Sequence, residues 1–241
     1  MDELKEKLRA WAKEYNTTDF IPNDPIQFPT NYIGNKKDVE ISGFVTSWIS
    51  FGNRRSIIDK ANYIDNEIFQ GKPFDYIASK KWEEYKGETK KIYRFFSYDD
   101  FYQLCWKLYY VYDNHDSLED AIKQLRFVSP LCALISIFGD INGIPFQNLC
   151  ACKRLCMFLR WMVRNDGIVD IGIWNSISPN DLIMPVDVHV HQMALQLGIT
   201  KRNLVNMKTA VEITDYMKTV FPNDPCLGDF ALFGYGVTHK V

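Results

Sequence analysis

The sequence predicts an all-α protein, and three observations lead to this class. Apolar residues recur at helical spacing along much of the chain, beginning with an amphipathic segment over residues 2–15. Ser97 and Ser117 each precede an acid by three positions, which is typical of helix N-termini. Runs of strict apolar and polar alternation, which would indicate strands, are missing, and no repeat of 20–50 residues stands out.

The composition is that of a folded globular protein. With 241 residues, 46% hydrophobic and 24% charged, the chain can bury a full core as one large domain or two packed lobes. The formal net charge of −2 gives no overall basic character. A nucleic-acid partner would therefore have to be bound by a local basic patch and by helix N-termini.

Neither a metal site nor a membrane segment is expected. The six cysteines form no paired C-x-x-C motif, and His189 and His191 are two positions apart, which is a poor spacing for a metal pair on a helix. The N-terminus is acidic and amphipathic, unlike a signal peptide, and no apolar run is long enough to span a bilayer. We expect a cytoplasmic protein with reduced thiols and no cofactor.

In the first half of the chain, residues 19–37 contain three prolines and predict an irregular connection. Residues 38–52 are apolar nearly all round, which predicts a buried helix. A further helix follows Asn53 and runs to about residue 70, whereas residues 71–96 are polar and mixed. The two serine caps then open the next two helices.

The second half continues in the same way. A short apolar helix follows Pro130, and a loop spans residues 139–145. Helices are predicted over residues 151–164, 187–197 and 208–220. Asp224 with the proline after it predicts an N-cap and first helical position for a C-terminal helix.

The helix over residues 151–164 has two different faces. Leu155, Leu159, Met162 and Val163 should face the core. A second face carries a basic stripe that is composed of Lys153, Arg160 and Arg164. The plainer interpretation is a solvated helix face. A lysine, with an ordinary pKa near 10.4, becomes a nucleophile only where burial or neighbouring cations remove its proton, and Arg154 and Arg160 are candidates for that influence.

Asp187 follows a proline and a valine at the start of the next predicted helix. One interpretation is a simple N-cap, which is the role of most such residues. The other is a carboxylate that stabilises a developing cation or orients a water molecule. The residues alone leave both open.

These residues resemble those of a known superfamily. V-D-x-H at a helix start, preceded by a helix that opens with a lysine, is similar to the helix-hairpin-helix DNA glycosylases, which include endonuclease III and the 8-oxoguanine glycosylases. The segments DPIQFP, CKRLCMFLRWMVR, DLIMPVDVHV and DFALFGYGV resemble, more closely, a DUF2400-like bacterial family of unknown function that is assigned to this superfamily. This closer resemblance covers almost the whole chain.

The resemblance implies a role for particular residues. Lys153 matches the lysine that forms a Schiff base in the bifunctional members, and Asp187 matches the aspartate that assists the chemistry. Residues 38–57 resemble an earlier helix whose end meets DNA. The expected DNA-binding residues are Asn53, Arg54, Arg55, Arg154, Arg160 and Arg164. Trp161 or Trp174 is expected to stack on the damaged base, although most aromatic residues of such a protein belong to its core.

The sequence also departs from the superfamily. Ala151 and Leu149 occupy the places of two hairpin glycines, whose backbone amides approach a phosphate closely. Lys153 and Asp187 are 34 positions apart, farther than in endonuclease III, although the archaeal 8-oxoguanine glycosylases also have a long gap. Only Cys226 follows Asp187, so the iron–sulfur motif of endonuclease III is absent.

The resemblance predicts a single glycosylase-like unit over residues 1–241 with two lobes and a cleft between them. Residues 45–150 would form a central helical lobe, and residues 1–44 with 188–241 a terminal lobe. Residues 151–187 would line the cleft.

The expected function is that of a monomeric DNA N-glycosylase with abasic-site lyase activity. It would act on double-stranded DNA that carries an oxidised purine such as 8-oxoguanine. The alternative is a nucleic-acid-binding protein of glycosylase fold without catalysis, which the missing hairpin glycines and the net charge favour. A third possibility is an enzyme that acts on a small substrate such as a nucleoside.

Overall fold

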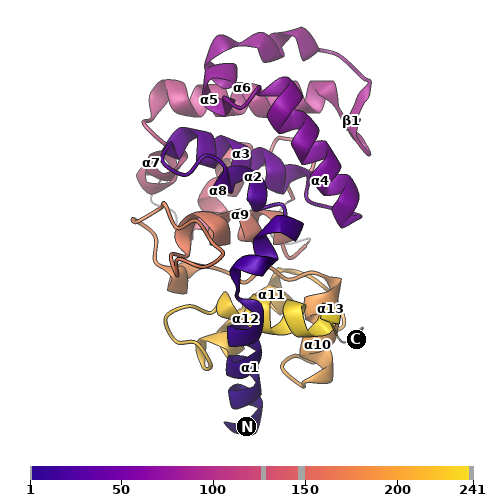
Figure 1. The fold of residues 1–241 in the computed structure, drawn as a ribbon, viewed down its shortest axis with the longest axis vertical. Coiled ribbons are helices and arrows are strands. Elements are labelled where there is room, and N and C mark those ends of the chain that lie inside the picture. Colours follow the sequence, from indigo (N-terminus) through magenta and orange to yellow (C-terminus); the bar gives the residue numbers. More distant parts are fainter. Residues whose placement is uncertain (1, 126–128, 146–149, 239–241) are drawn as a thin grey trace. The chain divides into compact units, whose positions relative to one another are not determined.

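The computed structural model describes residues 2–125, 129–145 and 150–238, and it confirms the predicted all-α class (Figure 1). Its α-helices are α1 (Asp2–Tyr15), α2 (Gln27–Thr30), α3 (Lys36–Ile49), α4 (Arg54–Tyr63), α5 (Pro73–Ser79), α6 (Tyr98–Asn114), α7 (Leu118–Gln124), α8 (Pro130–Phe138), α9 (Lys153–Val163), α10 (Val188–Gln196), α11 (Met207–Lys218), α12 (Leu227–Asp229) and α13 (Tyr235–Thr238). Short 3-10 helices span Thr18–Asn23, Lys81–Tyr85 and Pro179–Asp181, and π-helical turns span Ile64–Ile68 and Phe230–Gly234.

The chain forms two compact units. Unit 1 comprises residues 1–22, 129–131 and 145–241, and unit 2 comprises residues 23–128 and 132–144. These ranges differ from the expected lobes. Residues 23–44 belong with the helices of unit 2, and residues 151–187 belong with the terminal helices of unit 1.

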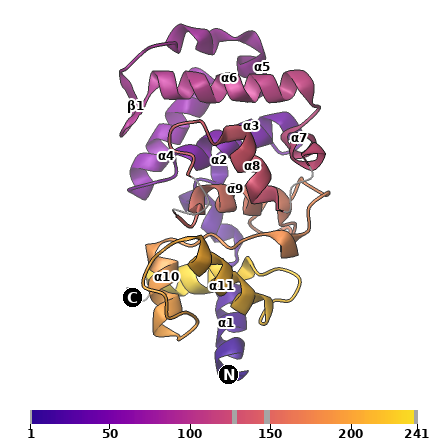
Figure 2. The same cartoon turned by 180° about the vertical axis from the view of Figure 1, so that it is seen from behind.

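Helix α3 is the buried centre of unit 2. Asn35 caps it by accepting a hydrogen bond from the backbone N–H of Asp38, and every residue from 39 to 49 is buried. In Figures 1 and 2, α6 lies on one side of α3 within this unit. Trp48 stacks on Phe96, with ring centroids 4.2 Å apart. The apolar character all round this segment therefore reflects a helix that is covered on all sides, as predicted.

A buried carboxylate joins α3 to α7. Glu40 has no exposed surface, and its Oε2 accepts hydrogen bonds from the backbone N–H of Leu118 at 2.9 Å and from the Tyr112 hydroxyl at 3.0 Å. Its other oxygen accepts from the backbone N–H of Glu119 at 3.3 Å. The first-turn amides of α7 thus stabilise a charge that would otherwise be costly to bury.

The serine caps are as predicted. Ser97 and Asp100 form a reciprocal capping box at the start of α6, and Ser117 accepts from the backbone N–H of Asp120 at the start of α7. A short hairpin over residues 91–97 was not predicted. There β1 (Lys91–Tyr93) pairs antiparallel with β2 (Phe96–Ser97). Strands this short cannot show the alternation from which a strand is predicted.

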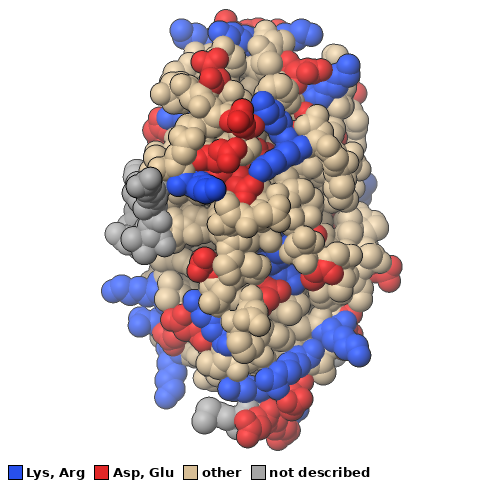
Figure 3. All heavy atoms as spheres, turned by 90° about the vertical axis from the view of Figure 1, so that its left-hand side faces the viewer, with Lys and Arg blue, Asp and Glu red and all other residues tan. Residues whose placement is uncertain are grey.

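Unit 1 is built around the C-terminal helices. α1 lies against the π-helical turn at Phe230–Gly234 and against α12, and Trp11 stacks on Tyr235 at 3.9 Å. The predicted cap at Asp224 is wrong, because α12 begins only at Leu227 and the Asp224 carboxylate pairs with Arg164 instead. On the molecular face in Figure 3, acidic and basic side chains are interspersed, in keeping with the net charge of −2.

Candidate functional site

Asp187 caps α10 with one oxygen of its carboxylate. Its backbone is extended, with φ −107° and ψ −171°, and its Oδ1 accepts a hydrogen bond from the backbone N–H of Val190 at 3.0 Å. This bond satisfies one of the amides that the first helical turn leaves without a partner. Val186 and Val190 are buried on either side of it, so the carboxylate is held in a fixed place while its side chain stays 22% exposed.

Lys153 is the first residue of α9, and its Nζ lies 3.7 Å from Oδ2 of Asp187. At this distance the two groups form an ion pair rather than a hydrogen bond. The lysine side chain is 37% exposed, so the pair is open to solvent on one side. The structure thus brings together two residues that are 34 positions apart in the sequence.

The turn before Lys153 has a left-handed residue that is not glycine. Cys152 has φ 49° and ψ 33°, a conformation that costs an ordinary side chain about 1–2 kcal/mol. Ala151, at one of the expected glycine positions, is buried, and Leu149, at the other, lies outside the described residues. The backbone therefore turns sharply into α9 at Cys152.

A second carboxylate belongs to this site, and the sequence analysis missed it. Asp229, the last residue of α12, contacts Nη1 of Arg160 and is 9% exposed. Burial raises its pKa to about 6, against the opposing attraction of Arg160, and the charges of Asp187 and Lys153 also act on it. An acid inside the apolar run LGDFALF was the signal that could have revealed it, because a charge there is expected to be buried.

Arg160 and Arg164 are buried, which does not favour their predicted role in DNA binding. They are 3% and 1% exposed, and Arg160 Nε lies 3.2 Å from Oδ1 of Asp170. Nε of Arg164 donates to Asp224 at 2.8 Å, and its Nη2 donates to Asp166 at 2.8 Å. Side chains that are enclosed by carboxylates present no surface to a phosphate. The predicted basic stripe is a solvent-exposed feature only at Lys153.

Burial alone would lower the pKa of Arg164, but the carboxylates of Asp170, Asp224 and Asp166 outweigh it and raise that pKa. The long segment between Lys153 and Asp187 thus supplies acids that neutralise Arg160 and Arg164. It also folds back onto this helix, because the backbone N–H groups of Ile171 and Gly172 donate to the carbonyl of Trp161.

Trp161 and Trp174 are core residues, which does not favour their predicted role in stacking on a base. They are 0% and 1% exposed, and Trp174 packs edge-on against Phe158 with centroids 5.4 Å apart. Side chains buried in this way leave no free face for a base. By contrast, the four apolar residues of α9 that were predicted to face the core are all buried.

The remaining predicted DNA-binding residues are not enclosed in this way. Arg154 is half-buried, and burial lowers its pKa against the influence of Cys150 and Cys152. In unit 2, Asn53, Arg54 and Arg55 are exposed at the start of α4. Asn53 caps this helix by accepting a hydrogen bond from the backbone N–H of Ser56 at 3.3 Å. Their role in DNA binding stays a prediction.

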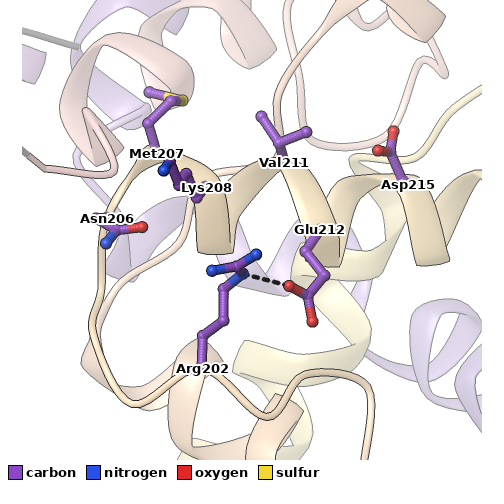
Figure 4. Close-up of a pocket in the computed structure, with 7 residues that line it drawn as sticks. All are labelled: Arg202, Asn206, Met207, Lys208, Val211, Glu212 and Asp215. Carbon is purple, nitrogen blue, oxygen red and sulfur yellow. Dashed lines mark hydrogen bonds and ion pairs between the residues drawn. The ribbon is translucent and has the colours of Figure 1, made fainter. Parts of the chain in front are cut away.

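A surface pocket of about 970 Å³ lies elsewhere in unit 1, along one side of α11 (Figure 4). Its lining residues are Arg202, Asn206, Met207, Lys208, Val211, Glu212 and Asp215. Arg202 and Glu212 form an ion pair at 2.5 Å across it. Because its charges are mixed and include neither Lys153 nor Asp187, this pocket does not mark the candidate site.

In residues 2–125, 129–145 and 150–238, no three His, Cys, Asp or Glu side chains are arranged to hold a metal ion. No helix in the same part of the chain is long and apolar enough to cross a membrane. The candidate site consists of Lys153, Asp187 and Asp229, and Arg160 contacts the Asp229 carboxylate.

A family model described as a protein of unknown function, DUF2400, matches residues 24–238. No curated protein and no solved structure matched the chain.

Proposed function

The chain belongs to the DUF2400 family, and we propose that it is a DNA N-glycosylase with abasic-site lyase activity that acts on an oxidised purine. The observation that carries this proposal is the Lys153–Asp187 pair, with an amine and a carboxylate 3.7 Å apart at the starts of two helices. The resemblance to the helix-hairpin-helix glycosylases supplies the chemistry for such a pair.

In that chemistry the damaged nucleotide first leaves the base stack, at a cost of a few kcal/mol that a lesion reduces. Lys153, once it has lost its proton, attacks C1′ of the sugar. A C–N bond forms, the N-glycosidic bond breaks, and the base departs with the bonding electrons and takes up a proton. The sugar ring opens to an imine, and loss of a proton from C2′ then expels the 3′ phosphate.

Asp187 would stabilise the positive charge that develops on the sugar. The cap to Val190 fixes one oxygen and leaves Oδ2 facing the amine of Lys153. Only a free amine attacks carbon, so the Lys153–Asp187 ion pair has to be rearranged when DNA binds. A partly exposed pair is suited to this rearrangement, because the bound DNA can cover the exposed side of Lys153 and Asp187.

The test is borohydride trapping, which reduces the imine and leaves the protein covalently attached to DNA. Duplexes that carry 8-oxoguanine, uracil or an abasic site would be compared with undamaged duplex. We expect an adduct with the wild type, none with Lys153→Gln, and loss of base release with Asp187→Asn. Lys208→Gln is the matched control, since Lys208 is an exposed lysine in the first turn of α11.

The second candidate is a DNA-binding protein of glycosylase fold without catalysis. Ala151 favours it, because this residue stands, buried, where the superfamily has a hairpin glycine whose backbone approaches a phosphate. Salt-sensitive binding to these duplexes, with neither adduct nor base release on a wider lesion panel, would establish this function instead. Release of a base without any adduct, abolished by Asp187→Asn, would show a monofunctional glycosylase.

A further inference from the structure

An exposed aromatic side chain lies at the tip of the β1–β2 hairpin in unit 2. Phe95 is 56% exposed, and the turn that carries it consists of Arg94 and Phe95 between the paired residues Tyr93 and Phe96. Its ring stacks on Phe51, with centroids 4.7 Å apart and planes inclined by 30°. Figures 1 and 2 show this hairpin on the same side of the unit as α4.

The tip is held in place by several contacts. The Tyr93 hydroxyl donates to the backbone carbonyl of Phe51 at 2.8 Å, and Lys91 Nζ donates to the carbonyl of Phe95 at 3.0 Å. The guanidinium of Arg94 lies against Gly52, where a Cβ would stand 1.9 Å from its Nη1. Gly52 has φ +93°, a conformation that favours glycine, and its missing side chain leaves room for the Arg94 guanidinium. Phe95 is therefore exposed on a fixed support.

The surroundings of Phe95 are positively charged. Residues 51–58 and 90–95 contain five basic residues and no acidic one. All five are exposed: Arg54, Arg55, Lys90, Lys91 and Arg94. In a chain with a net charge of −2, this concentration of one sign is local. We call residues 51–58 and 90–95 together the hairpin surface.

An aromatic face among cations fits a nucleic acid better than a protein partner. Bases stack on aromatic side chains without regard to sequence, and arginine and lysine contact the phosphates on either side. We propose that the hairpin surface binds DNA, with Phe95 stacking on a base and Arg55 and Arg94 contacting phosphates. This inference rests on the proposed function for the identity of the ligand. It adds Phe95 as a residue that would stack on a base that has left the duplex.

The test measures binding rather than catalysis. Fluorescence anisotropy would follow a labelled duplex with a tetrahydrofuran abasic site, which leaves a base without its partner. We expect Phe95→Ala to weaken binding by about 5- to 100-fold without changing its salt dependence, because a stack but no charge is lost. Arg94→Gln should reduce the slope of log K against log salt by about 0.9.

Trp106→Ala is the matched control, because Trp106 is an exposed aromatic residue of unit 2 outside the hairpin surface, on α6. It should bind like the wild type. Phe95→Tyr keeps the ring and should bind with the affinity that Phe95→Ala loses. Circular dichroism of both variants would show whether either has a folding defect. Equal binding by Phe95→Ala and Trp106→Ala would overturn the proposal.

This binding test and the trapping test separate the two proposals. Binding that depends on Phe95, with neither a trapped adduct nor release of a base, would support the hairpin surface and refute the glycosylase. An adduct with full binding by Phe95→Ala would do the reverse. Failure of the wild type to bind any duplex would overturn both.

Discussion

Arg164 is almost completely buried, yet carboxylates from two segments of the chain surround its guanidinium. In the sequence it occupies the same helix face as Lys153, and helical spacing alone cannot separate an exposed cation from a buried one. What decides its environment is the fold of residues 166–170 and of Asp224, which come from later in the chain. The local sequence pattern therefore predicted the helix and its core face, but not which of its charged side chains are buried.

Replacing Arg164 with methionine should lower the free energy of unfolding by about 3–5 kcal/mol, because it leaves buried acids without a partner. Urea denaturation would measure this loss. Arg202→Met is the control, since the ion pair of Arg202 with Glu212 is exposed and should contribute less than about 1 kcal/mol. A similar small loss for both variants would contradict the ion-pair network described here.

Asp229 should make stability depend on pH. Its folded-state pKa of about 6 lies above its ordinary value of 3.8, so its contribution to stability is fully present below the lower value and is lost as the pH rises through the higher one. Between about pH 4 and 7 the wild type should lose up to about 3 kcal/mol relative to Asp229→Asn. Denaturation of both proteins across this range would measure the difference, and parallel profiles would refute it.

The candidate site could be predicted in part. Lys153 and Asp187 were singled out because the segments that carry them resemble those of the helix-hairpin-helix glycosylases. The structure places the two side chains 3.7 Å apart. Asp229 was missed because nothing near it in the sequence indicates that the end of α12 would lie by this pair. Contacts of this kind arise from tertiary packing.

At the scale of elements, the Asp187 side chain stabilises the start of α10 as its N-cap. Asp187→Ala should destabilise the protein by about 1 kcal/mol through loss of the cap, whereas Asp187→Asn, which retains a capping oxygen, should cost only a few tenths. Thermal denaturation would distinguish them. Ser97→Ala, which removes the cap of α6, should match the alanine variant and serves as its reference. Equal losses for the alanine and asparagine variants would argue against capping.

The helices were predictable because their caps and apolar faces are local. The β1–β2 hairpin was not, because its strands have three and two residues and its turn uses Arg94 at φ +50° rather than glycine or asparagine. Phe95 and Phe96 look alike in the sequence, although one is exposed and the other is buried. That difference follows from pairing with β1.

At the scale of the whole molecule, the net charge of −2 limits electrostatic attraction to DNA. Arg55 and Arg94 would together give a slope of log K against log salt of roughly −2. A titration from low to moderate salt would test this. A slope near −10 would mean that a broad basic face, absent from the proposal, contacts the backbone.

The bounds of the two units could not be predicted from the sequence either. Residues 23–44 contain prolines and no clear periodicity until α3, so nothing assigned them to the unit that they help to build. The long segment before Asp187 was expected to line a cleft. In the structure it belongs to unit 1, where its acids bind the arginines of α9.

The cap at Asp187 has a consequence for catalysis in general. A flexible carboxylate must give up rotational freedom each time it stabilises a transition state, and this loss raises the barrier. Here the hydrogen bond from Val190 fixes the side-chain rotamer during folding. The carboxylate is thus preorganised before any substrate arrives, and in the proposed reaction its reorganisation energy would be correspondingly small.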